Sequence, residues 1–257
     1  MNTNHLPSIV LGSHTHLLYS SFVDDEYELS IWLPPSYETS EQVYPTLYVL
    51  DSPIFFGSCV WNSLFQNWDA GVPELIVVGI GKRLSSFDEW WPIRDRDYAL
   101  VPVPWSTPGS GHGENFFKFI GQELIPFVDK NYRTNPEDRI LYGQSLSGSF
   151  AIHALFSQPN LFSRCIATAP AFDDSGQIIF DYEQALATAT FPSEVCLFIS
   201  ISSLDPAFGP GAEAFAAAIL AKEIPNLKFQ KMTIEGLAHT PAAMPGFLYG
   251  IEAVYAM

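Results

Sequence analysis

Short, continuously apolar runs alternate along this chain with segments whose apolar residues recur at helical spacing. TLYVLD at residues 46–51 and LIVVGI at residues 75–80 are the purest of these runs. Such runs are typical of parallel strands that are buried on both faces. Further strands are expected at residues 139–142, 164–169, 195–202 and 228–234, and helices at residues 114–130, 145–157, 211–223 and 241–257. The alternation predicts a single-domain α/β fold with a mostly parallel central sheet and helices on both faces.

Three features modify this scheme. YELSIWL at residues 27–33 alternates and then meets two prolines, which predicts an antiparallel or edge strand. Pro126 should kink or shorten the helix expected at residues 114–130. Residues 82–113 hold several tryptophans among prolines and glycines, and we expect one long loop there, of the kind that often borders a functional site. No repeat or linker divides residues 1–257, which are expected to form one domain.

Composition limits the partners of this chain. Its 257 residues include 28 acidic and 12 basic ones, for a net charge of −16, so phosphate backbones and anionic membranes would repel it. No run is long enough to span a membrane and no signal peptide is evident, which predicts a cytoplasmic protein. The three cysteines lack CxxC spacing, and neither an HExxH motif nor a glycine-rich phosphate loop is present. We therefore expect no metal and no cofactor; the sequence indicates no particular oligomeric state.

The strongest local signal is RILYGQSLSGSF at residues 139–150, which reads as a strand, a sharp turn and a helix. Gly143-x-Ser145-x-Ser147 is similar to the nucleophile elbow G-x-S-x-G. In such an elbow the serine occupies a strained turn, so that its hydroxyl projects above the sheet. The residues two before and two after it must be small, because the strand and the helix nearly touch. Gly143 and Ser147 are both small, so Ser145 is the candidate nucleophile.

A serine hydroxyl needs a base, and the base needs an orienting carboxylate. In this type of sheet the expected chain order is serine, acid, histidine. His239 is the only histidine after Ser145 outside the elbow helix, and Asp205 directly follows an apolar strand at its carboxyl end. Asp173, Asp174 and Glu213 remain rival acids, and a serine–histidine dyad without an acid is a further alternative. His153 is expected to lie on a helix face, His112 in a turn, and His5, His14 and His16 away from the carboxyl edge of the sheet.

An oxyanion hole requires two backbone N–H donors. Leu146, directly after the candidate nucleophile, should supply one of them. The second should come from the loop after strand 46–51, where Pro53 has no N–H. Ser52 or Ile54 must then donate, and we choose Ser52.

Several stretches resemble the putative-esterase branch of the α/β-hydrolases, which contains siderophore-ester hydrolases and feruloyl-type esterases. These are YELSIWLPPSY at residues 27–37, YPTLYVLD at residues 44–51, RDRDYALVPVP at residues 94–104 and, most densely, residues 113–148. The resemblance implies a serine hydrolase that cleaves carboxylic esters through an acyl-enzyme. It also implies that Arg94 and Arg96 lie beside the pocket and hold a polar part of the substrate, although pairing with Asp88, Asp95 or Asp97 is an equal alternative.

This chain departs from the family pattern at three places. Ser52 and Pro53 follow the aspartate of the third strand where the family usually has glycine, and Ser147 stands where a glycine is usual. The tryptophans that many siderophore-ester relatives carry after the sixth strand are absent from residues 169–174. That absence puts a siderophore ester in doubt as the substrate, but it does not affect the candidate nucleophile or base.

Two hypotheses follow. The first is an esterase acting on a small-molecule ester, with Phe55, Trp90 and Trp91, and also Phe56 and Trp105, as candidates for an apolar pocket. Acyl transfer and peptide hydrolysis would use the same residues. The second is a non-catalytic binding protein on the same fold, motivated by the departures at Pro53 and Ser147. A displaced oxyanion donor would cost about 10²–10³ in rate.

Overall fold

The computed structural model describes residues 10–102, 109–172 and 182–257. Eight strands form one sheet in the order β1-β2-β4-β3-β5-β6-β7-β8. Their bounds are β1 Ser13–Ser20, β2 Asp25–Trp32, β3 Tyr44–Val49, β4 Ile76–Gly81, β5 Thr134–Gln144, β6 Arg164–Thr168, β7 Val195–Ser202 and β8 Leu227–Ile234. β2 pairs antiparallel with both β1 and β4, and all the other pairings are parallel. The mostly parallel sheet confirms the predicted α/β class.

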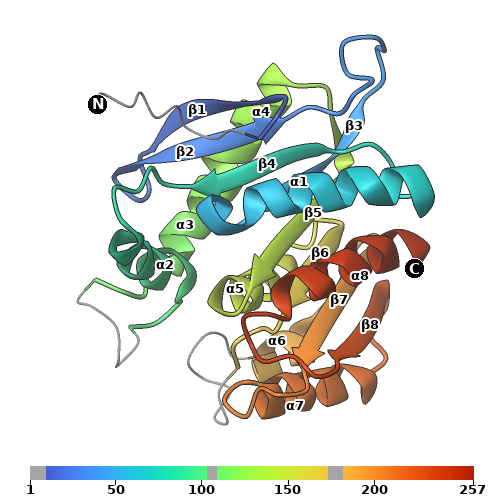
Figure 1. Cartoon of the computed structure of the whole chain (residues 1–257). Coiled ribbons are helices and arrows are strands. Elements are labelled where there is room, and N and C mark those ends of the chain that lie inside the picture. Colours follow the sequence, from blue (N-terminus) through green and yellow to red (C-terminus); the bar gives the residue numbers. More distant parts are fainter. Residues whose placement is uncertain (1–9, 103–108, 173–181) are drawn as a thin grey trace.

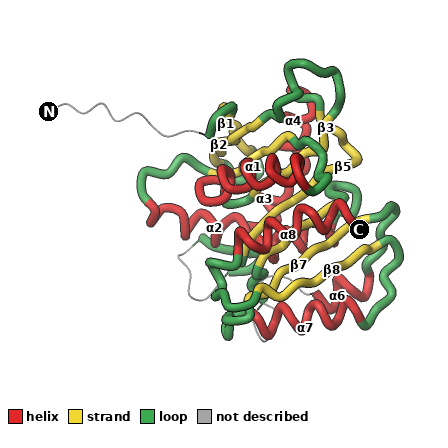
Figure 2. The backbone as a smooth tube through the Cα atoms, turned by 45° about the vertical axis from the view of Figure 1, so that its right-hand side comes forward, coloured by secondary structure: helices red, strands yellow, loops and turns green. Residues whose placement is uncertain are grey.

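Helices cover both faces of the sheet (Figures 1 and 2). On one face α1 (Ser52–Asp69) and α8 (Ala243–Ala256) lie side by side over a core that includes Val60, Phe247 and Ile251. The opposite face carries α5 (Leu146–Ser157) and α7 (Gly209–Leu220), with Phe150 and Phe215 in the second core. The short helix α6 spans Tyr182–Thr188. The central strands are therefore apolar on both sides, as the continuous runs in the sequence predict.

The helix expected at residues 114–130 is present in three consecutive pieces. α3 (Gly113–Phe119) leads into a π-helical turn at Ile120–Leu124 and then into α4 (Ile125–Asn131). Pro126 lies in the first turn of α4, directly after the π-turn, so the helix accommodates the missing N–H by a local change of hydrogen-bond spacing.

Several elements differ from the sequence-based expectations. β1, α1 and α6 were not predicted, and the expected long loop at residues 82–113 contains a 3₁₀ turn at Phe87–Glu89 and α2 at Trp90–Tyr98. The buried residues of α2 include Arg94 and Asp97, so an apolar periodicity could not reveal it. Among the described residues, no helix combines the length and the apolar character that crossing a bilayer requires.

Candidate active site

Ser145 lies between β5 and α5 in a backbone conformation that few residues adopt. Its φ is 59° and its ψ is −122°. Three backbone bonds hold this turn: the Ser145 N–H donates to the Thr168 carbonyl, and the Ser145 carbonyl accepts from Ser149 and Ala171. A Cβ on Gly143 would lie 2.2 Å from the Ser147 carbonyl oxygen, which shows how closely the strand and the helix approach. The local geometry is that of a nucleophile elbow, in which surrounding structure maintains a strained residue.

Three side chains from separate segments form a hydrogen-bonded chain at the carboxyl edge of the sheet. Asp205 follows β7, and His239 follows β8. The His239 Nε2 lies 2.8 Å from the Ser145 Oγ, and its Nδ1 lies 2.5 Å from the Asp205 Oδ2. The other carboxylate oxygen of Asp205 accepts the backbone N–H groups of Ala207 and Phe208. Because an ionised carboxylate only accepts, Nδ1 carries the imidazole proton and Nε2 is left to accept from the serine hydroxyl.

The rival acids and the other histidines lie elsewhere or have other partners. Glu213 forms an ion pair with Lys231 at 2.5 Å, and Asp173 and Asp174 fall outside the described residues. His153 bonds Glu114, and burial lowers the pKa of its imidazole, an effect that the Glu114 charge partly offsets. His112 precedes α3. His14 and His16 lie near the start of β1, where both contact the Tyr132 hydroxyl, away from the carboxyl edge of the sheet as expected. His5 lies outside the described residues.

The two expected oxyanion donors occupy equivalent places in their helices. Leu146 is the first residue of α5 and Ser52 the first of α1. N–H groups in the first turn of a helix have no carbonyl partner within that helix. The Ile54 N–H is used in a bond to the Asp51 carbonyl at 2.9 Å, which leaves Ser52 as the available donor of the two considered. Pro53 falls at the helix start, where a missing N–H costs nothing.

Arg94 and Arg96 are both held by carboxylates. Arg94 is only 4% exposed, and its Nε lies 2.8 Å from the Asp51 Oδ1. Burial disfavours its charged form, but the Asp51 carboxylate outweighs that cost and the pKa of Arg94 is raised. Arg96 pairs with Asp25 at 2.7 Å and with Asp97 at 2.6 Å. The Arg96–Asp97 pair agrees with the alternative stated from the sequence, whereas Asp51 and Asp25 are partners that this alternative did not name. Substrate contact by either arginine remains a prediction.

The aromatic candidates divide into core and surface. Phe55 is 6% exposed and packs edge-on against Tyr142, so the structure corrects its expected place in a substrate pocket. Phe56 is likewise in the core. The Trp90 indole donates to Asp51, whereas Trp91 is 51% exposed and lies 4.6 Å from the Trp90 ring. Trp105 lies outside the described residues. Trp91 at the start of α2 and Phe87 in the 3₁₀ turn before it therefore form an exposed aromatic surface.

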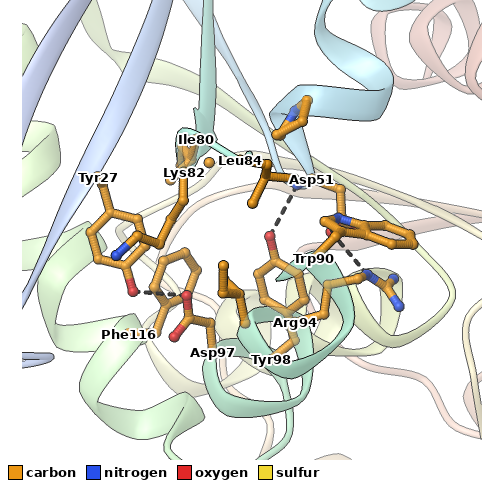
Figure 3. A pocket seen from close by; sticks show the side chains of 13 residues that line it. Tyr27, Asp51, Ile80, Lys82, Leu84, Trp90, Arg94, Asp97, Tyr98 and Phe116 are labelled. Carbon is orange, nitrogen blue, oxygen red and sulfur yellow. Dashed lines mark hydrogen bonds and ion pairs between the residues drawn. The ribbon is translucent and has the colours of Figure 1, made fainter. Parts of the chain in front are cut away.

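A small cavity lies between α2 and the sheet and is lined by Trp90, Arg94 and Tyr98 among others (Figure 3). Its volume is about 20 Å³, enough for about one water molecule but not for a substrate. Asp97 lines it, and burial raises the pKa of that carboxyl against the opposing charge of Arg96. A larger groove of about 260 Å³ adjoins Ser52 and is lined by Glu28, Ser30, Ser52, Pro53, Gly81, Lys82, Arg83 and Leu84. The groove, unlike the cavity, has room for part of a small molecule.

Asp51 belongs to this region although nothing in the sequence singles it out beyond its place beside the oxyanion loop. Its carboxylate contacts Trp90, Arg94 and Ser147. Its partners lie far away in sequence, and its sole local signal is a position directly after an apolar strand. In the described part of the chain, no group of three or more histidine, cysteine, aspartate or glutamate residues could hold a metal ion.

Comparison with known proteins supplies the family. The profile of the family described as "Putative esterase" matches residues 20–224. The chain belongs to this family. It is 26% identical over 172 residues to the ferri-bacillibactin esterase BesA of Bacillus subtilis, a match that covers 62% of this chain and 58% of BesA. The chain spans about half the length of the curated relatives it matches, between 46% and 58% for three of them.

Solved structures agree over nearly the whole chain. The BES protein from Bacillus cereus superposes with a TM-score of 0.84 at 25% identity, covering 99% of this chain and 98% of that protein. The siderophore hydrolase EstA from Aspergillus nidulans gives a TM-score of 0.83 at 18% identity, with 97% and 96% covered. The second likeness concerns the fold alone. Together these findings confirm the resemblance that the sequence motifs indicated.

Proposed function

We propose that this protein is a serine esterase that hydrolyses small-molecule carboxylic esters through an acyl-enzyme on Ser145. The observation that carries the proposal is the hydrogen-bonded chain from Ser145 through His239 to Asp205. The buried Asp205 carboxylate holds the imidazole in the tautomer that carries its proton on Nδ1. Ser145, at the other end, is partly exposed and so can be reached by a substrate. Membership of the esterase family supports the same chemistry.

The proposed reaction has two halves. The Ser145 Oγ attacks the ester carbonyl carbon while the His239 Nε2 takes its proton, and the carbonyl electrons move onto oxygen. Collapse of that oxyanion expels the alcohol, which receives the proton from His239. In the second half, His239 takes a proton from water as the water oxygen attacks the acyl carbon. Collapse of the second oxyanion expels the Ser145 Oγ, which regains its proton from His239, and the acid is released. The N–H groups of Leu146 and Ser52 would stabilise the oxyanion in both halves.

The substrate is proposed as a class only. Relatives carry names that refer to siderophore esters, and one solved neighbour is a ferulic acid esterase. An ester panel for this chain should therefore include a siderophore lactone, a feruloyl ester, an acetylated sugar and a simple aryl ester. Adding an alcohol acceptor to the same assays separates hydrolysis from acyl transfer by the product formed.

A fluorophosphonate probe, with the adduct mapped by mass spectrometry, tests the nucleophile. We expect one adduct on Ser145 that is lost in Ser145→Ala and in His239→Ala. Ser157→Ala, at the other end of α5, and His112→Ala, before α3, serve as matched controls that keep the adduct. A folded wild-type protein that is not labelled and cleaves no ester in the panel would refute the esterase and favour the binding protein.

A further inference from the structure

The side chain of Asp51 does not cap the helix that it precedes. Asp51 precedes α1 with a left-handed φ of 53°, at the N-cap position. An aspartate there usually accepts a hydrogen bond from an N–H of its own helix. In this protein no such side-chain bond forms. The carboxylate is buried, with 2% of the residue exposed, and points away from the helix it precedes.

The two oxygens of this carboxylate bind two other elements instead. The Oδ1 accepts from the Trp90 Nε1 at 3.1 Å and from the Arg94 Nε at 2.8 Å, both on α2 (Figure 3). The Oδ2 accepts from the Ser147 Oγ at 2.7 Å, on α5. The Asp51 N–H itself donates to the hydroxyl of Tyr98 at the end of α2. One residue thus ties the start of α1 to α2 and to the elbow helix.

The partners of Asp51 converge on the peptide groups directly before Ser145. The Ser147 Oγ accepts the Gln144 N–H at 2.9 Å. The Gln144 carbonyl accepts from the Arg94 Nη2 at 3.0 Å. Every one of these groups is buried. The bonds that hold Asp51 therefore also hold the backbone that leads into the candidate nucleophile.

The spacing of the candidate oxyanion donors depends on the same bonds. The Ser52 N–H belongs to the residue after Asp51, and the Leu146 N–H to the residue before Ser147. We propose that Asp51 and Ser147 are positioning residues whose hydrogen bond fixes these two N–H groups relative to each other. The proposal rests on the proposed esterase function. Ser147 is 0% exposed and cannot touch a substrate, so it acts only through the groups that its hydroxyl holds in place.

This brace, defined as the Asp51–Ser147 bond together with Arg94, also gives a reason for the serine at position 147. If the elbow required only a small residue at position 147, glycine would also suffice. The hydroxyl adds a donor for Asp51 and an acceptor for Gln144. Arg94 neutralises the carboxylate, which would otherwise oppose a negative charge developing nearby. In this proposal the Ser147 hydroxyl therefore helps to hold the site in place, and the departure from glycine does not impair the elbow.

The test compares Ser147→Ala, Ser147→Gly and Asp51→Asn with wild type on an aryl ester. We expect kcat to fall by about 10- to 100-fold, because small misplacements of oxyanion donors cost factors of this size. KM should change by no more than about threefold, because the substrate touches none of these side chains. The apparent pKa in the kcat/KM profile should stay at its wild-type value, because His239 and Asp205 are unaltered. The double variant Asp51→Asn/Ser147→Ala should lose about as much as the worse single variant.

A transition-state analogue gives a second readout that a merely structural role would not move. The carbonyl carbon of an aryl trifluoromethyl ketone bonds to the Ser145 oxygen, the serine proton passes to His239, and the ketone oxygen becomes the oxyanion. Its inhibition constant should rise by the same factor as kcat falls. Asp129→Asn is the matched control, because Asp129 on α4 also pairs with an arginine, Arg139, and a hydroxyl, Thr134. Thr134 begins β5, so this pair lies at the end of the strand opposite Ser145.

The outcomes separate the two proposals. The brace would be overturned if wild type is active and the folded Ser147 variants keep wild-type kcat and inhibitor affinity. A loss equal to that of Asp129→Asn, or one confined to KM, would also overturn it. If wild type is neither labelled nor active, the proposed function fails first. If Asp51→Asn does not fold, as judged by thermal unfolding, the two Ser147 variants decide alone.

Discussion

Replacement of Asp205 by asparagine should stop the proposed reaction by trapping the wrong tautomer of His239. Two backbone N–H groups, from Ala207 and Phe208, point at the Asp205 Oδ1 at 3.2 and 3.1 Å. Since an N–H only donates, these groups fix the oxygen of an introduced amide on their side. The amide NH₂ must then face the His239 Nδ1, which in wild type lies 2.5 Å from the other oxygen.

That orientation determines the size of the effect. The His239 Nδ1 has to accept from the amide, so the imidazole proton moves to Nε2. An Nε2–H donates to the Ser145 Oγ and cannot take its proton. In serine proteases the same substitution costs about 10⁴ in kcat, or about 5 kcal/mol of barrier. We expect a loss of that order here, with thermal stability close to wild type because the shape is unchanged.

The assay is hydrolysis of an aryl ester by Asp205→Asn and wild type, with ¹⁵N NMR of the labelled imidazole as the structural readout. The expected result is loss of activity together with a proton on Nε2. An Nδ1 proton in Asp205→Asn, or a loss below about tenfold, would refute the tautomer argument. Glu213→Gln, which breaks a surface pair with Lys231, is the control and should keep wild-type activity.

Three further outcomes are expected. Gly143→Ala should lower the free energy of unfolding by about 1–3 kcal/mol, because its Cβ would meet the Ser147 backbone; a chemical melt that matches wild type would contradict this. Stability should fall as the pH drops below 6.5, because burial lowers the pKa of His153 and the unfolded chain then takes up the proton more readily; His153→Gln should flatten that slope, and an unchanged slope would exclude the histidine as a cause. Trp91→Ala should raise KM for aryl-acid esters and leave acetate esters unaffected; equal effects on both would remove Trp91 from the acyl site.

The sheet and the three residues that meet at its edge were accessible to sequence reasoning. Buried parallel strands appear as unbroken apolar runs, and the carboxyl ends of neighbouring strands face one edge. Ser145 and Asp205 follow strands with such runs, and His239 follows the less apolar last strand, so their order in the chain predicts that they approach one another.

The parts that were missed lack that kind of signal. β1 is an edge strand with a largely exposed face, so burial imposes little pattern on it. α2 buries Arg94 and Asp97 through ion pairs, which an apolar periodicity does not detect. Asp51 gains its role from partners 43 and 96 residues away, at Arg94 and Ser147. Such long-range polar contacts exist only once the chain is folded.

The strand order also bears on how the protein regains its site after denaturation. Ser145, Asp205 and His239 follow β5, β7 and β8, and these strands are joined through β6. Each parallel pairing in this region brings together segments far apart in the chain, and such pairings form slowly. The elbow at Ser145 can therefore be in place while its base is not. Recovery of fluorophosphonate reactivity should lag behind recovery of helix, and the lag measures the docking of β7 and β8 onto the rest of the sheet.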